Sequence, residues 1–329
     1  MRGVDLARWR FDWDLTFAMV AARPDGQVLH RYGGRDARGA DHWLNVASLK
    51  AFLQAGLESY RSAAADAGKL GPSRSLDEVP PFAIRDKGAC IHCHSVNPAL
   101  RIEAQQAGTW TRASLWTYPA PARIGLDLHA ERQTEVITVE PGSVAAKAGV
   151  RVGDRLARLG EARLATASDL MAALHALPPA ATPTTIHVVR GDGQEPVALA
   201  AQLPSGWKVA PPEDFAWRPS KWGLSPAPGF GGPVLDPGEL RELGLKPSVF
   251  AFRVSYLVNW GENKRWGQRA AAAGIAKGQV VLGAGGKRDF ASIDHFHAWW
   301  RLTRKAGESV PVTLWEGGEE REIPLPVGE

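Results

Sequence analysis

Apolar residues follow two different spacings near the start of the chain. A largely apolar run, DLTFAMVA (residues 14–21), predicts a strand, a PDG turn follows, and QVLHRY (residues 27–32) alternates as a second strand should. Beyond residue 45 the spacing becomes helical, with apolar side chains three or four positions apart at Leu49, Phe52, Leu53, Leu57 and Tyr60. The pattern predicts a β-hairpin followed by a helix with one apolar face.

The same order of apolar and polar positions occurs twice in the rest of the chain. The stretch AAKAGVRVGDRLARLGEARLATASDLMAALHAL matches AAAAGIAKGQVVLGAGGKRDFASIDHFHAWWRL further on. The matched pairs keep one constant separation, and they are Gly149 with Gly274, Gly153 with Gly278, Gly160 with Gly285, Asp169 with Asp294 and Leu177 with Leu302. Chance does not keep register over so many positions, so two copies of one domain are expected.

Composition and charge narrow the class of protein. The chain has 329 residues, 44% of them hydrophobic and 22% charged, which is typical of a globular protein with more than one domain. Its net charge of +4 is small for this length, so nucleic acid is not an expected partner. No run approaches the ~18 apolar residues of a membrane span. The first residues, MRGVDLARWRFDWD, lack the apolar core of a signal peptide.

The N-terminal hairpin and helix resemble the last part of a thioredoxin fold. The likeness covers about the first sixty residues, and it does not include the redox cysteine pair of that fold. GPSRSLDEVPP then has the turn-forming composition of a linker. We therefore expect a partial thioredoxin-like segment over residues 1–70 and a linker over residues 71–118.

The two repeats resemble PDZ domains of the bacterial type. RIGLDL is similar to the carboxylate-binding loop of that family, and VEPGSVAAKAGVRVGDRLARLGEARL is similar to its most diagnostic run. TASDLMAALHAL is similar to the second helix, with Thr166 as N-cap and Asp169 in the first turn. The fold class expected is α+β, with two PDZ-like β-barrel or sandwich domains at residues 119–205 and 206–329.

The resemblance implies a peptide-binding groove in the first repeat. In it, an extended peptide or a protein C-terminus adds to an exposed strand edge and alternate side chains enter pockets. We expect Gly125 to let backbone N–H groups approach a carboxylate, because glycine has no Cβ. The residues expected to bind the peptide are Arg123, Ile124, Gly125, Leu126, Asp127, Leu128, Met171 and His175.

The second repeat departs from the family pattern. GFGGPVL is a plausible carboxylate loop, but DPGELRELGLKPS and NWGENKRWGQR are inserted around the next strand. His295, His297, Trp299 and Trp300 on its second helix could line a groove, although an aromatic core with surface histidines is the expectation we favour. Peptide binding is therefore expected of the first repeat only.

Both cysteines of the chain lie in the segment GACIHCH. Cys90, Cys93 and His94 fit C-x-x-C-H, the attachment motif of c-type haem, with His94 as axial ligand to the metal. A distal ligand would come from His30, His42, His92, His129 or a partner. A redox-active disulfide, a zinc site with His92 and His94, and a purely structural pair are the alternatives.

The layout as a whole resembles a bacterial family of thioredoxin-like/PDZ proteins, some of them selenoproteins. The resemblance implies redox association and a periplasmic location. Three functions are open at this point: a non-enzymatic peptide-binding adaptor with a haem or dithiol redox centre, a thiol–disulfide oxidoreductase, and a structural interaction module. No G-x-S-x-G, H-E-x-x-H or Walker A sequence favours another enzyme. The sequence sets no oligomeric state.

Overall fold

The computed structural model describes residues 4–62, 73–80, 92–191 and 195–328. The chain divides into two compact units, residues 1–210 and 211–329. Both are mixed α/β units built on small antiparallel sheets, and no sheet closes into a barrel within the described residues. The barrel part of the sequence expectation is therefore not met. Within the same ranges, no helix is both long and apolar enough to cross a membrane.

Unit 1 begins with the expected hairpin and helix. Strands β1 (Ala18–Ala22) and β2 (Val28–Gly33) pair antiparallel, and α1 (Val46–Ser62) follows. The apolar face expected for α1 is wrong in part. Phe52 is buried, but Leu53, Leu57 and Tyr60 are each about half exposed, because Ser48 and Gly56 form the rest of the packed face. Gly56 has no side chain, and a Cβ there would lie 3.0 Å from the Ala21 Cβ, so glycine lets the hairpin approach α1 closely.

The expected linker contains regular structure. The 3-10 turns η1 (Leu76–Glu78) and η2 (Cys93–Ser95) lead to helix α3 (Val96–Gln106), and η3 (Arg112–Leu115) follows. Val96 and Ala99 of α3 form a small core with Leu6, Trp13, Leu76 and Val79. This core joins η1 and α3 to the first residues of the chain.

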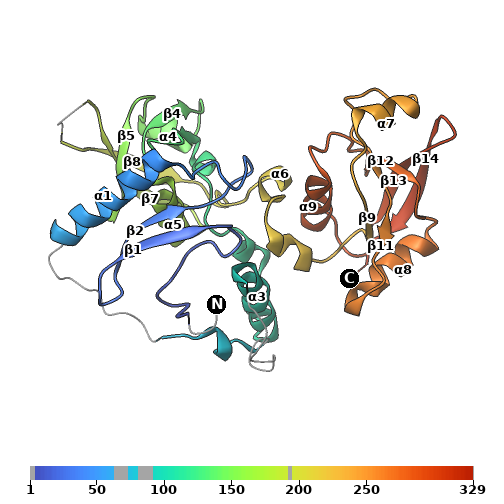
Figure 1. The fold of residues 1–329 in the computed structure, drawn as a ribbon, viewed down its shortest axis with the longest axis horizontal. Helices are drawn as coiled ribbons and strands as arrows, with labels where there is room; N and C mark the ends of the chain where they lie inside the picture. Colours follow the sequence, from blue (N-terminus) through green and yellow to red (C-terminus); the bar gives the residue numbers. More distant parts are fainter. Residues whose placement is uncertain (1–3, 63–72, 81–91, 192–194, 329) are drawn as a thin grey trace. The chain divides into compact units, whose positions relative to one another are not determined.

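The first repeat completes unit 1 (Figure 1). Its elements are η4 (Pro121–Ile124), β3 (Leu126–Leu128), β4 (Val136–Val139), α4 (Val144–Ala148), β5 (Arg155–Leu159), β6 (Ala162–Arg163), α5 (Ala167–Ala176), β7 (Thr182–Val189) and β8 (Val197–Leu203). β3 pairs with β4, and a second sheet has the order β6-β5-β7-β8. Thr166 caps α5 by accepting the N–H of Asp169, as the sequence predicts.

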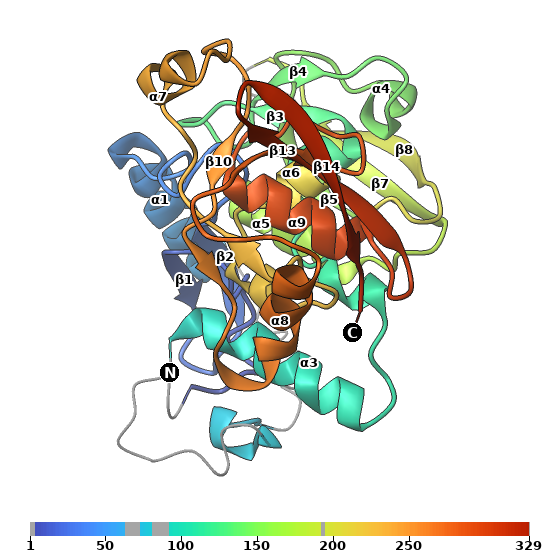
Figure 2. The same ribbon diagram turned by 90° about the vertical axis from the view of Figure 1, so that its right-hand side faces the viewer.

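Unit 2 contains the second repeat (Figure 2). Its elements are α6 (Pro212–Phe215), η5 (Pro219–Gly223), β9 (Phe230–Gly231), α7 (Pro237–Glu242), β10 (Phe252–Arg253), β11 (Tyr256–Leu257), η6 (Gly261–Asn263), α8 (Lys264–Ala272), β12 (Val280–Ala284), α9 (Ile293–Thr303), β13 (Ser309–Glu316) and β14 (Glu319–Pro326). The sheets are β9-β11 and β10-β12-β13-β14.

The two repeats share their strand order and one irregularity. β5-β7-β8 corresponds to β12-β13-β14, and helices α5 and α9 stand at matched places in the sequence. The register shifts between Leu156 and Arg158 against β7, and it shifts between Val281 and Gly283 against β13. These bulges lie at repeat-matched positions, so the common ancestry visible in the sequence extends to backbone detail.

Gly125 and Gly153 provide a matched test of local packing. Both have a left-handed backbone, with φ of +81° and +85°. A Cβ on Gly125 would lie 2.1 Å from the Ser143 Cβ, whereas a Cβ on Gly153 would meet nothing within 4 Å. We expect Gly153→Ala to cost about 1 kcal/mol of unfolding free energy from backbone strain alone. Gly125→Ala should cost at least about 2 kcal/mol more, because overpacking is added. Urea denaturation of both variants checks this, and equal costs would contradict it.

Candidate functional site

The N-terminal hairpin docks on the first turn of α5 through one buried carboxylate. Asp169 Oδ2 accepts a hydrogen bond from His30 Nδ1 at 2.8 Å, and Oδ1 accepts the N–H of Arg31 at 2.8 Å. The N–H of Ala165 donates to Oδ2 at 3.0 Å, and the Thr166 hydroxyl donates to the Arg31 carbonyl. The Asp169 side chain is 3% exposed. Its charge is therefore matched by donors from both elements, as burial requires.

This arrangement corrects one sequence expectation. His30 was a candidate distal ligand for haem, but its Nδ1 faces Asp169 and its Nε2 lies 2.8 Å from the Ser59 hydroxyl. Both ring nitrogens are thus engaged inside unit 1. No motif in the sequence indicates this pairing, because His30 and Asp169 belong to different predicted domains.

The groove expected between β3 and α5 is occupied by residues 34–43, which we call the first cover segment. Trp43 is fully buried and clusters with apolar residues of both β3 and α5. Its indole N–H donates to Asp36 at 3.1 Å, and its carbonyl accepts from Gln133 at 2.7 Å. Gly34 lies directly over α5, since a Cβ there would be 2.9 Å from the Met171 terminal methyl.

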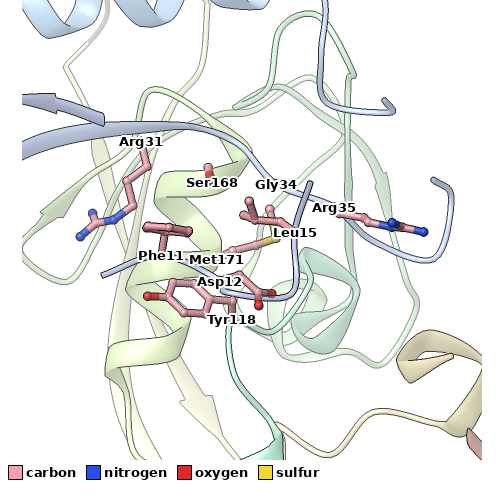
Figure 3. Close-up of a pocket in the computed structure, with 9 residues that line it drawn as sticks. All are labelled: Phe11, Asp12, Leu15, Arg31, Gly34, Arg35, Tyr118, Ser168 and Met171. Carbon is pink, nitrogen blue, oxygen red and sulfur yellow. The ribbon is translucent and has the colours of Figure 1, made fainter. Parts of the chain in front are cut away.

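Figure 3 shows how little space remains beneath this cover. A cavity of about 10 Å³, room for about one water molecule, separates α5 from the N-terminal residues. Met171 points into it, whereas the Arg31 and Arg35 side chains extend away on opposite sides. Its lining residues are Phe11, Asp12, Leu15, Arg31, Gly34, Arg35, Tyr118, Ser168 and Met171.

The structure places most of the expected peptide-binding side chains in the core. Ile124, Leu126, Leu128 and Met171 are each less than 5% exposed and belong to one cluster. They pack within the repeat and under the cover segment, and they do not face solvent.

The other three side chains make contacts at the margin of this cluster. Asp127 pairs with Arg38 of the cover segment at 2.6 Å, and Arg123 donates to the Val209 carbonyl at 3.0 Å. His175 stacks on Tyr118 with ring centroids 4.3 Å apart. Burial raises the pKa of the Tyr118 hydroxyl, so this ring is neutral at ordinary pH.

The loop expected to bind a carboxylate is wound on itself. The N–H of Arg123 donates to Ala120 at 2.9 Å, and the N–H of Gly125 donates to Ala122 at 3.0 Å. Gly125 is required because Ser143 packs where its Cβ would lie. The expectation that Gly125 leaves room for a ligand carboxylate is therefore replaced by a packing role.

One edge of β3 pairs with no other described strand, although Leu126 and Leu128 are almost fully buried. The Gly125 carbonyl accepts from Glu140 on the β4 side, so Leu126 presents its backbone groups to the opposite edge. Among the described strands, β3 pairs only with β4. The cover segment fills the side-chain space of the groove and does not pair with this edge.

The second repeat is covered in the same way. Residues 212–224, which we call the second cover segment, pack on α9. Lys221 Nζ binds Asp294 at 2.8 Å, and Arg301 donates to the Leu224 carbonyl. Asp294 is the repeat match of Asp169, so the same position anchors the N-terminal hairpin in the first repeat and the second cover segment in the second.

The histidines of α9 are not surface residues, which corrects the favoured expectation. His295 and His297 are 5% and 3% exposed, beside the buried Phe296, Trp299 and Trp300 that form the expected aromatic core. Trp222 of the second cover segment meets His297 edge-on, with ring centroids 4.8 Å apart. Neither ring nitrogen of His297 has a hydrogen-bond partner among the described residues.

The glycine-rich loop of the second repeat is also a packing feature. A Cβ on Gly229 would lie 2.3 Å from the Trp266 backbone, and one on Gly232 would lie 1.8 Å from the Arg253 carbonyl oxygen. Gly231 lies against Tyr256 and His297. These glycines are therefore filled around by neighbouring backbone and side chains, and they leave no room for a ligand carboxylate.

Only part of the cysteine motif can be placed. Cys90 lies outside the described residues. Cys93 is half-buried in η2, and its thiol points to the Leu15 carbonyl at 3.6 Å. His92 and His94 are exposed and stack with ring centroids 5.5 Å apart. In the described ranges, no group of three or more His, Cys, Asp and Glu side chains is arranged to hold a metal ion.

Comparisons with known proteins add little to this geometry. No protein-family model matches the chain, and no curated protein matches it either. Among solved structures the chain is similar to an HtrA-type protease with a decapeptide, at 16% identity and a TM-score of 0.25. The match covers 44% of this chain and 40% of that chain. A likeness this distant does not bear on the function.

His297 makes the stability of unit 2 depend on pH. Burial, followed by the charges of Arg301 and Lys221, holds its pKa well below 6.5. In the unfolded chain the His297 imidazole therefore takes up a proton near pH 6.5, whereas in the folded unit it stays neutral. The free energy of unfolding then falls as pH falls below that value. The loss from this histidine should approach about 1.4 kcal/mol per pH unit.

Hydrogen exchange of α9 and β13 at pH 7.5 and 5.5, corrected for intrinsic rates, measures this loss. His297→Gln removes the titrating group and should flatten the dependence by up to that amount. His94→Gln, a change at an exposed histidine, is the control and should leave it unaltered. An equal pH dependence in all three proteins would show that His297 is not responsible.

Proposed function

We propose that the chain is a peptide-binding module whose first repeat acts as a PDZ-like groove with a resident internal occupant. An extended segment of a protein partner binds by adding to the outer edge of β3 while the first cover segment moves aside. The observation that carries the proposal is the unpaired backbone edge of β3, buried beside a side-chain space that Trp43 fills.

The contacts of the cover segment support displacement in place of permanent closure. The Arg38–Asp127 pair has side chains 38% and 40% exposed, so it contributes about 0–1 kcal/mol. Arg38 also lies 4.9 Å from the centre of the Trp43 ring. Residues 34–43 contain no regular helix or strand and pair only through one bridge, Asp36 to Gly39. Their attachment therefore depends chiefly on Trp43, through burial of its indole and the hydrogen bond from Gln133 to its carbonyl.

The first cover segment lowers the affinity expected for a partner, because it must be displaced first. Removing a buried Trp side chain costs about 3–5 kcal/mol, so the open state is populated at roughly one part in a thousand. Apparent affinity falls by the same factor. Because the N–H groups of the wound loop are engaged, an internal extended segment is the ligand this edge favours, and a free C-terminus is the alternative outcome.

Two arginines provide a matched test. Arg38 pairs with Asp127 and with Asp36 and contacts the Trp43 ring, whereas Arg23 pairs with Asp25 and contacts the Tyr60 ring. Only Arg38 belongs to the first cover segment. Random peptides displayed on phage, either internal or with a free C-terminus, are selected on the full chain, and titration calorimetry gives their affinities.

Arg38→Ala should bind the selected peptides up to about fivefold more tightly, because up to about 1 kcal/mol of cover attachment is lost. Arg23→Ala should bind as the unaltered chain does. Trp43→Ala, if its circular dichroism is retained, should gain more than Arg38→Ala. The proposal fails if no peptide is selected by any variant, or if Arg38→Ala and Arg23→Ala bind equally.

The redox centre stays a prediction. A c-type haem on Cys90 and Cys93, with His94 as axial ligand, would need the Cys93 thiol to leave the Leu15 carbonyl. An absorbance spectrum of the chain, expressed with the haem-attachment machinery, decides this: a Soret band supports haem, and its absence removes that assignment.

A further inference from the structure

Ser59, His30 and Asp169 form a continuous hydrogen-bonded chain in unit 1. Ser59 lies in the last turn of α1, His30 in β2 and Asp169 in the first turn of α5. The Ser59 hydroxyl lies 2.8 Å from His30 Nε2, and His30 Nδ1 lies 2.8 Å from Asp169 Oδ2. A carboxylate only accepts, so Nδ1 carries the proton and Nε2 is left to accept from the serine. This is the order and spacing of a Ser–His–Asp triad.

The serine end of this chain lines a cavity. It is broadly open to solvent, and its volume of about 380 Å³ falls within the ~300–1,000 Å³ of small-molecule sites. The α1 side contributes Ser59 and Glu58, β2 contributes His30, and the opposite wall comes from β5, β6 and the residues that follow them. Both Ser59 and His30 line this space, so a bound substrate would lie beside the serine.

Three arginines line the opposite wall: Arg155, Arg158 and Arg163. Arg158 and Arg163 are direct cross-strand partners, so their side chains share one face, and like charges placed in this way repel. The bulge between Leu156 and Arg158 sets Arg155 on the same side of β5 as Arg158.

The positive charge of this wall is weakly compensated. The Glu161 partner of Arg158 is 98% exposed at 3.5 Å, so that pair contributes little. Among the described residues that line the cavity, Glu58 is the one carboxylate. An anionic group on a ligand would relieve the repulsion between the arginines.

The arginines also supply positive charge that the helix end at Ser59 does not. α1 ends at Ser62, so the serine lies at the negative end of the helix dipole. Negative charge developing on a reacting carbonyl oxygen gains nothing from that helix. Guanidinium groups across the cavity are the donors that can stabilise it. Their loss should therefore lower the rate of the chemical step as well as substrate binding.

We propose that this cavity is a serine-type hydrolytic site for small carboxylate-bearing esters. Ser59 Oγ forms a bond to the ester carbonyl carbon while its proton passes to His30 Nε2. The carbon–oxygen bond to the alcohol breaks, and the alcohol leaves with that proton. Water then adds to the acyl-serine, giving a proton to His30, and cleavage returns that proton to Ser59. Asp169 is the positioning residue for His30.

The contrasting interpretation is structural: the serine only satisfies the ring nitrogen of a histidine that fastens β2 to α5. The two differ at Ser59. Docking needs the bonds from Asp169 to His30 and Arg31, which Ser59→Ala leaves in place, whereas hydrolysis needs the hydroxyl. Ser62, an exposed serine in the same helix, supplies the matched control.

The test uses the full chain with defined probes. A fluorophosphonate reports a nucleophilic serine, and mass spectrometry locates the label. Mono-4-nitrophenyl glutarate and 4-nitrophenyl pentanoate compare an anionic acyl chain with a neutral one of equal length. Variants are Ser59→Ala, Ser62→Ala, Arg158→Gln and Arg163→Gln, each checked by circular dichroism.

We expect the label on Ser59 in the unaltered chain and in Ser62→Ala, and none in Ser59→Ala. Glutarate hydrolysis should fall at least tenfold in Ser59→Ala, and the arginine variants should lose most of the preference for the anionic ester, with kcat lowered as well as KM raised. Labelling and hydrolysis that are unchanged in a folded Ser59→Ala would overturn the proposal. Hydrolysis without a preference for glutarate would overturn the anionic substrate class.

Discussion

The organisation of unit 1 depends on one buried carboxylate in the first turn of α5. Asp169 accepts from His30, from the backbone N–H of Arg31 and from Ala165, and it is almost fully removed from water. A buried charge is tolerated only when donors surround it, so each of these groups must be in place for the others to be stable. The docking of the hairpin on the first repeat and the orientation of His30 follow from the same requirement.

The matched aspartate of the second repeat meets this requirement differently. Asp294 is about half exposed and takes a lysine from the second cover segment, whereas Asp169 takes a histidine and a backbone N–H. A solvated carboxylate satisfied by one flexible side chain imposes less order on its partner. The aromatic packing of Trp222 on His297, together with the bond from Arg301, then holds the second cover segment. The two repeats therefore keep an aspartate at the same position. In the first repeat buried hydrogen bonds to it hold the docked segment, and in the second aromatic packing contributes more.

The sequence predicts what depends on neighbours in the chain. The hairpin, the helix after it, the N-cap at Thr166 and the repeat follow from local spacing and from glycines at turns, whereas the matched bulges are seen only in the structure. The buried face of α1 does not, because it is decided by the close approach of β1 at Gly56. The contents of the groove and the Ser59–His30–Asp169 chain join residues of separately predicted domains, and no motif in the sequence links them.

The anchor and the cover differ in how firmly they are held, and this difference decides whether binding and chemistry can coexist. Residues 30 and 31 are fixed to Asp169 by buried hydrogen bonds, whereas the cover segment that begins at residue 34 is held at its exposed edge by Arg38. Gly33 and Gly34, with φ of +107° and +97°, separate the two parts. A partner at β3 therefore needs to release Trp43 but not His30. Opening the groove can leave the histidine bonded to Ser59, so neither proposed activity requires the other to be lost.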